Sequence, residues 1–181
     1  MELVLTINQI FPLFTLIGQI TIILLVISFF VFREKEKNVI LSFFSKNAII
    51  LAFIVALVST IVSLFYSEIV GWEPCKLCWF QRVFMYPQVI LLGMALWKKK
   101  KNIKDYSIVL SLVGTLIAGF HYYLQVGDPP QIICSTLNNL SSCSKIFIME
   151  FGYITFPIMS LTAFLLIISF LISQKIYLRN Q

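Results

Sequence analysis

Polar and apolar positions divide the chain into five long apolar runs joined by shorter polar connections. Each run holds about 19 to 23 residues, enough to cross a hydrocarbon core of about 30 Å as an α-helix. Lipid offers no hydrogen-bond partner to exposed backbone groups, so helices are the expected form. We therefore predict an all-α, polytopic membrane helix bundle with spans at roughly residues 11–32, 48–70, 79–97, 106–126 and 153–173.

Composition favours a membrane protein over a soluble one. Of the 181 residues, 59% are hydrophobic and 12% are charged, and a soluble domain of this length has too much surface to hide that apolar content. The net charge of +6 would suit a nucleic acid, but the basic residues lie at the ends of the apolar runs, as topology signals do. The first run lacks a basic leader and a clear cleavage site, so we expect a membrane helix rather than a signal peptide.

The basic residues also predict an orientation. Eleven of the 14 lysines and arginines lie in the connections 33–46 and 98–104 and in the tail after residue 173. Cytoplasmic segments carry such an excess, so these three segments are expected on the cytoplasmic side. With five spans, the N-terminus then lies outside and the C-terminus in the cytoplasm.

The four cysteines form two pairs, and both pairs fall on the predicted outer side, where disulfides persist. Cys75 and Cys78 form a Cys-x-x-Cys pair at the mouth of the third run, and Cys134 and Cys143 lie in the outer loop 127–152. Thiol–disulfide exchange moves electrons between such pairs. Two structural disulfides and a zinc site with four thiolates are the alternatives, although the eight residues between the second pair exceed the usual zinc-ligand spacing.

The surroundings of the first pair distinguish its two sulfurs. Pro74 favours a helix that begins near the motif, so Cys78 is expected in or just before the first helical turn. The backbone N–H groups and the helix dipole there, together with Arg82 one turn further on the same face, lower the pKa of the Cys78 thiol. Neither effect applies to Cys75, which is better placed as the exchanging partner.

Arg82 and His121 point to a site beside Cys78. Arg82 lies about 6 Å inside the helix start, where a charge is costly unless it snorkels to the headgroups or meets a partner. His121 lies at a similar depth, about 9 Å below the outer end of the fourth run. A lone histidine is commonly a satisfied structural group, but the matching depth favours a shared site. A membrane-soluble acceptor with polar carbonyls, such as a quinone head group, suits it.

Three motifs make a resemblance specific: "CKLCWFQRVFMYP" from residue 75, "HYYLQ" from residue 121 and "FGYITFPIMSLTAF" from residue 151. They resemble, in the expected order, the DsbB family of disulfide-bond formation proteins, especially its short BdbC-like branch. The resemblance covers roughly residues 47–175. It implies a four-helix thiol oxidase of the bacterial cytoplasmic membrane, linked to ubiquinone or menaquinone, which reoxidises a DsbA-like thioredoxin-fold oxidase. Disulfide bonds would thereby form outside the cytoplasm.

The resemblance also implies a domain division. Residues 47–181 would be the DsbB-like four-helix domain, with the outer loop 127–152 as its redox-active loop. Residues 1–46, a first helix and the "REKEK" connection on the cytoplasmic side, are extra to the usual four spans. The family pattern assigns no role to this extension.

Roles for the cysteines follow from the resemblance, with redox disulfides Cys75–Cys78 and Cys134–Cys143. The thiolate of the partner protein would attack Cys134 and form a mixed disulfide. Released Cys143 would attack Cys75, and Cys78 would be left as the thiolate that donates electrons to quinone.

The resemblance places further residues at the quinone. Arg82 would stabilise the thiolate and polarise the quinone, and His121 occupies the position of a histidine near it. Gln81 is a candidate lining residue, whereas Tyr86 fits an interfacial anchor better. No metal is expected.

Two other functions remain open. A conduit that reduces exported proteins would need cysteines reachable from the cytoplasm, and the predicted topology offers none. A zinc-binding or structurally disulfide-bonded membrane scaffold without catalysis is the non-enzymatic alternative.

Overall fold

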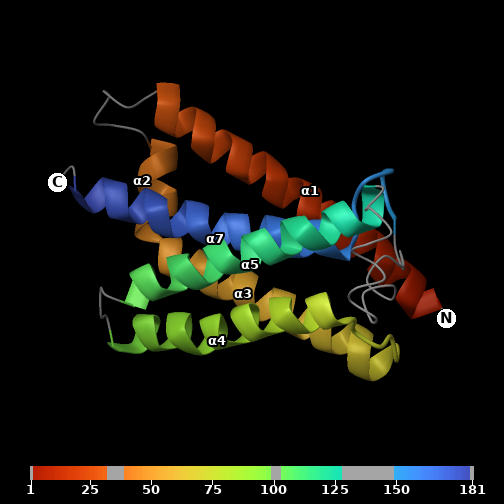
Figure 1. Ribbon diagram of the computed structural model, residues 1–181. Coiled ribbons are helices and arrows are strands. Elements are labelled where there is room, and N and C mark those ends of the chain that lie inside the picture. The colour runs from red at the N-terminus through yellow and green to blue at the C-terminus, as the bar shows by residue number, and fades with distance from the viewer. Residues whose placement is uncertain (1, 32–38, 99–102, 128–148, 180–181) are drawn as a thin grey trace.

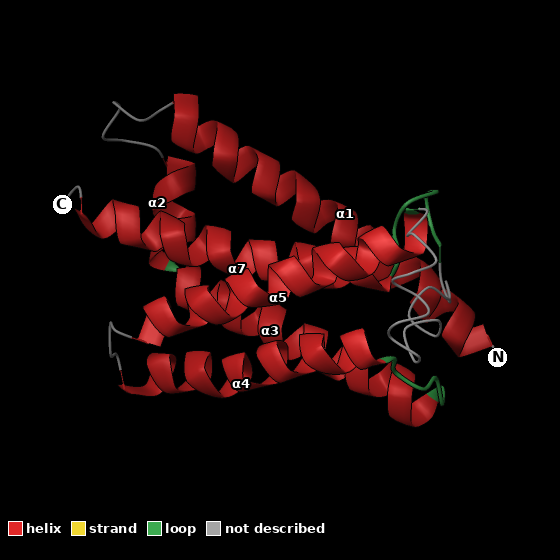
Figure 2. Ribbon diagram, viewed as in Figure 1, coloured by secondary structure: helices red, strands yellow, loops and turns green. Residues whose placement is uncertain are grey.

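The structure is a computed structural model that describes residues 2–31, 39–98, 103–127 and 149–179. These residues are almost wholly helical, as Figure 2 shows, which confirms the predicted all-α membrane bundle. The elements are, in chain order, α1 (Glu2–Val31), α2 (Val39–Lys46), α3 (Ala48–Leu64), the π-helical turn η1 (Phe65–Ile69), α4 (Lys76–Lys98), α5 (Ile103–Val126) and α7 (Phe156–Arg179).

Four helical segments of the described residues are long and apolar enough to cross a membrane. They are Gln9–Ser28 in α1, Ala48–Ile69 in α3 with η1, Ile103–Val126 in α5 and Phe156–Tyr177 in α7. The remaining predicted span falls on α4, which is long enough but is more polar than the others. Helix α4 nevertheless packs against both α3 and α5, and Figure 1 shows it running alongside them.

The polar residues of α4 explain why it differs from the other four. Gln88 is 0% exposed, and its Oε1 accepts hydrogen bonds of 3.0 Å from the hydroxyls of Ser107 and Ser111 on α5. Its Nε2 donates to the carbonyl of Phe84 within α4. Because lipid cannot satisfy an amide, this group is stable only between helices. The polar positions of α4 therefore face its neighbours.

Helix α7 lies at the centre of the bundle, where it packs against α1, α2, α3, α4 and α5. On α3, small residues recur once per turn at Ala48, Ala52 and Ala56, and all three are fully buried. Small side chains let helix backbones approach closely, which is how helices associate in lipid. The fully buried Phe164 and Ile167 of α7 belong to the same core cluster.

The helix ends that flank the predicted cytoplasmic segments meet at one end of the bundle. Figure 1 shows the end of α1, the start of α2, the end of α4, the start of α5 and the C-terminal end of α7 at one side of the bundle, opposite the N-terminus. An exposed ion pair of 2.9 Å between Lys175 and Asp105 joins α7 to α5 at this end. Lysines 99–101 and the "REKEK" residues lie outside the described residues. The direction of the bundle across the membrane stays a prediction.

A close approach at Gly114 yields a stability prediction. A Cβ atom at this position of α5 would overlap the ring of Phe164, which is 0% exposed and cannot swing away. We expect Gly114→Ala to lower the free energy of unfolding by about 1–3 kcal/mol, and with it the thermal unfolding midpoint in detergent. Gly119→Ala is the matched control, because its Cβ would meet Leu161 at an ordinary 3.8 Å. Equal midpoints for the two variants would contradict this packing.

Candidate functional site

The Cys-x-x-Cys pair lies where α4 begins. The N–H of Trp79 donates to the carbonyl of Cys75 at 3.1 Å, which is the first hydrogen bond of the helix. Cys75 therefore stands at the N-cap and Cys78 lies in the first turn, as Pro74 predicts. The backbone N–H groups of this turn have no carbonyl of α4 to bond, and they favour negative charge on a nearby sulfur.

Three side chains of redox or metal-binding type converge at this helix start. The Sγ atoms of Cys75 and Cys78 are 3.3 Å apart, a contact between sulfurs that are not bonded to each other. Nε2 of His121, on α5, lies 3.7 Å from Sγ of Cys75. The three potential ligand atoms all lie within 4.8 Å of one another. The structure thus brings the histidine to Cys75, the cysteine that sequence reasoning left without a polar neighbour.

The hydrogen bond from Gln81 sets the tautomer of His121. The side-chain Nε2 of Gln81 donates to Nδ1 of His121 at 3.0 Å, and both side chains are buried. Because Nδ1 accepts, the proton of the neutral ring resides on Nε2. The ring N–H therefore faces the sulfur of Cys75 and can stabilise negative charge on it.

Arg82 is hydrogen-bonded to a residue of α3. Its Nη2 donates to the carbonyl of Ser63 at 3.0 Å, and its guanidinium lies 5.3 Å from the ring centroid of Trp79. Its Nε is buried and finds no hydrogen-bond partner among the described residues. A buried donor without an acceptor costs free energy.

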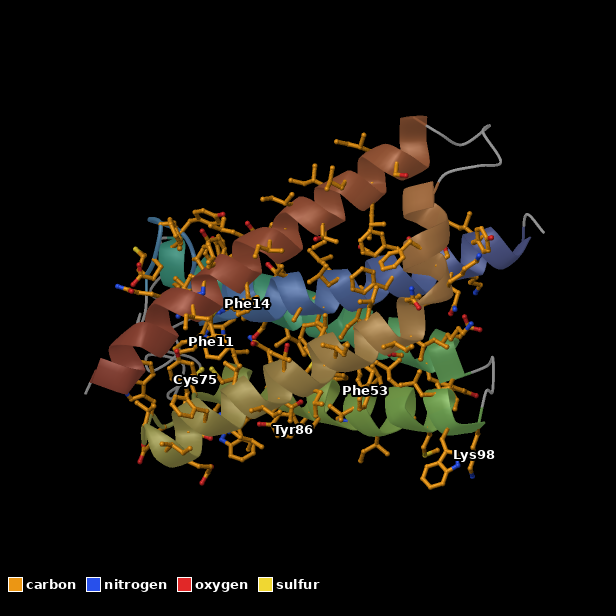
Figure 3. The ribbon with its side chains drawn as sticks, turned by 180° about the vertical axis from the view of Figure 1, so that it is seen from behind. Phe11, Phe14, Phe53, Cys75, Tyr86 and Lys98 are labelled. Carbon is orange, nitrogen blue, oxygen red and sulfur yellow. The ribbon has the colours of Figure 1, made fainter. Side chains whose placement is uncertain are left out.

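A cavity of about 710 Å³ connects these side chains. Its polar end is lined by Cys75, Cys78, Gln81, Arg82 and His121, and most of its remaining wall is apolar. Figure 3 shows Cys75 at the end of the bundle opposite Lys98. This volume and lining are typical of a site for a small apolar molecule with a polar head. Arg82 and His121 share the cavity, as their matching depth suggests, but their hydrogen bonds go to different groups.

Two groups of residues line the cavity that the sequence pattern did not place there. Tyr86, which fitted an interfacial anchor better, lines the cavity and donates a hydrogen bond of 3.4 Å to the hydroxyl of Ser63. It lies four residues after Arg82, so the helical period put both on one face. Helix α1 also lines the cavity, with Phe14 among its residues, and no pattern in the sequence indicated this. Cys134 and Cys143 lie outside the described residues.

Comparisons with known proteins identify the family of the chain. The profile of the family described as "Disulfide bond formation protein DsbB" matches residues 45–174. The chain is 40% identical over 136 residues to the SPbeta prophage-derived disulfide bond formation protein B of Bacillus subtilis (strain 168), which is 75% of this chain and 89% of that protein. It is 37% identical over 133 residues to disulfide bond formation protein C of the same organism, 72% and 96% of the two chains.

A third relative comes from another organism. The chain is 36% identical over 126 residues to a probable disulfide formation protein of Metapseudomonas resinovorans, which is 70% of this chain and 88% of that protein. No solved structure matches the chain. The profile match covers well over half of the chain, and the relatives are matched over most of their length. The chain therefore belongs to the DsbB family of disulfide bond formation proteins.

Proposed function

We propose that this disulfide bond formation protein reoxidises a DsbA-like thioredoxin-fold oxidase on the outer side of the cytoplasmic membrane and passes the electrons to a membrane quinone. One observation carries the proposal. The Cys75–Cys78 pair and Arg82 line one largely apolar cavity, and the buried Nε of Arg82 finds no acceptor among the described residues.

The residues of the cavity fit a quinone. A quinone head offers carbonyl oxygens that accept hydrogen bonds, and the guanidinium of Arg82 is a hydrogen-bond donor among the residues that line the cavity. The apolar part of the cavity suits an isoprenoid chain. Arg82 would hold the head group, and Gln81 and His121 line the same end. When bound, the quinone takes up the two electrons and two protons that the Cys75–Cys78 dithiol loses as it forms a disulfide.

The cysteines relay the electrons by exchange. A thiolate of the partner attacks Cys134, and the partner's second thiol resolves the mixed disulfide, so that the partner is oxidised and Cys134 and Cys143 are reduced. Cys143 then attacks Cys75 of the Cys75–Cys78 disulfide and displaces Cys78 as a thiolate. Attack of Cys134 on the Cys143–Cys75 bond restores the loop disulfide and leaves Cys75 and Cys78 reduced. Two electrons move in each exchange, and no further oxidant is needed before the quinone.

The surrounding side chains give the two sulfurs different roles. The first turn of α4 and the cation of Arg82 favour the Cys78 thiolate that donates electrons. The N–H of His121 faces Cys75 and stabilises the charge that develops on this sulfur when Cys134 displaces it. Gln81 is a positioning residue, since it sets which nitrogen of His121 carries the proton.

A zinc-binding scaffold is the second candidate, and one observation favours it. Cys75, Cys78 and His121 offer three ligand atoms close together, a set that occurs at zinc sites. These three ligands leave one of the four positions of a structural zinc site to be filled from outside the group.

Titration of thiols tests the two candidates. Full-length protein is purified, its four cysteines are fully reduced, and quinone is added without oxygen. We expect all four thiols to be lost as two disulfides form, with two quinones reduced per chain, and no zinc by metal analysis. Four thiols that persist in the presence of quinone, together with one bound zinc per chain, would show the scaffold instead.

A further inference from the structure

Helix α1 lies outside the part of the sequence that matches the family profile. The family profile matches residues 45–174, so α1 (Glu2–Val31) precedes the match. Yet α1 is packed into the bundle through α7 and α2.

The contact between α1 and α7 is close and specific. A Cβ atom at Gly18 of α1 would lie 2.9 Å from Cδ1 of Leu166, so the two helices approach closely there. Next to it, Nε2 of Gln19 donates to the hydroxyl of Thr162 at 3.4 Å, and the hydroxyl of Tyr153 donates to Oε1 of Gln19 at 2.8 Å. These contacts hold α1 against α7 and against Tyr153, which precedes α7.

In this position, α1 forms one wall of the cavity. Lining residues of α1 begin at Phe11 and end at Thr21, a rise of about 15 Å along the helix. On α7 the lining extends from Phe156 to Phe170, a rise of about 21 Å. Figure 3 shows Phe11 and Phe14 of α1 on the side of the bundle where Cys75 lies. The cavity is therefore a long space that begins at the cysteine pair and continues between α1, α3 and α7.

Aromatic rings mark both ends of this space. At the cysteine end, Phe11 of α1 meets the ring of Tyr66 edge-on at 6.4 Å, and Tyr66 stacks on Trp72 at 5.3 Å. At the far end, Phe44 of α2 stacks on Phe170 of α7 at 5.7 Å. A head group at the cysteines would thus have a largely apolar space beside it, between α1, α3 and α7.

We propose that α1 is the outer wall of a subsite for the isoprenoid chain of the quinone, which lies between α1, α3 and α7 with Ile17 in contact with the chain. This rests on the proposed function and deepens it. The polar end holds the head group, and α1 supplies apolar surface that a quinone without a chain would not use. Helix α1 would therefore affect the affinity for long-chain quinones and leave the chemistry at the cysteines unchanged.

Two isoleucines of α1 give a matched pair of variants. Ile17 lines the cavity, whereas Ile20 does not, and their side chains are similarly exposed at 52% and 57%. Full-length Ile17→Trp and Ile20→Trp proteins are compared with the wild type in lipid vesicles. Each is assayed with a quinone that bears a long isoprenoid chain and with its analogue that has none.

The Ile17→Trp indole would occupy part of the chain's path. We expect it to raise the KM for the long-chain quinone about tenfold, as the loss of contact with one or two methylene groups implies. The KM for the chainless analogue should stay unchanged, and Ile20→Trp should change neither value. Unchanged kinetics with the analogue also show that the variant is folded.

A binding measurement complements the kinetics. A quinone analogue with a photoreactive group in its chain is irradiated with the wild type, and labelled peptides are mapped by mass spectrometry. We expect label on the α1 peptide around Phe14 and Ile17, with loss of that label in excess unlabelled quinone. Label confined to other helices, or a KM ratio that is the same in Ile17→Trp and wild type, would overturn the α1 subsite. If the wild type reduces neither quinone, the proposed function itself fails, and the subsite with it.

Discussion

Replacing Cys78 with serine is expected to abolish quinone reduction. A hydroxyl neither forms a disulfide nor provides the thiolate that transfers electrons, so no dithiol remains at the polar end of the cavity. Cys78 lies in the first turn of α4 and lines the cavity, and it is the sulfur that we propose as the donor to the quinone. The measurement is the absorbance of the quinone during anaerobic turnover with reduced partner.

Oxidation of the partner by the Cys78→Ser protein serves as the control. Exchange between the partner and the Cys134–Cys143 pair does not involve Cys78, so one equivalent of partner should still be oxidised when the loop disulfide is intact. An unchanged thermal midpoint would show that the bundle is intact. If Cys78→Ser reduced quinone at the wild-type rate, the division of roles between Cys75 and Cys78 would be wrong.

Replacing Arg82 with glutamine is expected to have the second largest effect. The change removes the cation that lines the cavity together with Cys78, and with it the buried Nε donor. Loss of one preorganised donor to developing charge typically lowers a rate about 10²–10³-fold, and we expect quinone reduction to fall by about 10²-fold. Stopped-flow measurement of quinone reduction by the reduced protein isolates this step from exchange with the partner.

Arg82→Lys separates charge from geometry. Lysine retains the positive charge but lacks the Nε donor and the planar fork that reaches the carbonyl of Ser63. We expect a rate between those of the wild type and Arg82→Gln. Wild-type rates in both variants would mean that Arg82 snorkels to the headgroups and has no part in the reaction.

Local patterns predicted the helices and the place of the cysteine pair. Runs of apolar residues located the five long helices, and Pro74 located the start of α4 close to Cys78. The polarity of α4 was harder to interpret. Gln88 lowers the apolarity of the helix, but it is hydrogen-bonded between helices, and a sequence does not show which residues meet a helix across the bundle.

The contacts within the site depend on residues far apart in the chain. His121 lies 46 residues from Cys75, so sequence reasoning gave its depth but not which cysteine it faces. The hydrogen bond from Gln81 that fixes the histidine tautomer was equally hidden. The wall formed by α1 depends on the close approach at Gly18, a single glycine in an apolar run that gave no local signal.

Coupled turnover tests the proposed electron path most directly. Purified full-length protein in lipid vesicles is supplied with an excess of a reduced thioredoxin-fold dithiol and quinone in the absence of oxygen. We expect one quinone to be reduced for each partner dithiol oxidised, over many turnovers, and none when the partner is omitted after the protein's own thiols are spent. A partner that stays reduced while the protein retains bound zinc and four reduced thiols would contradict a quinone-linked thiol oxidase.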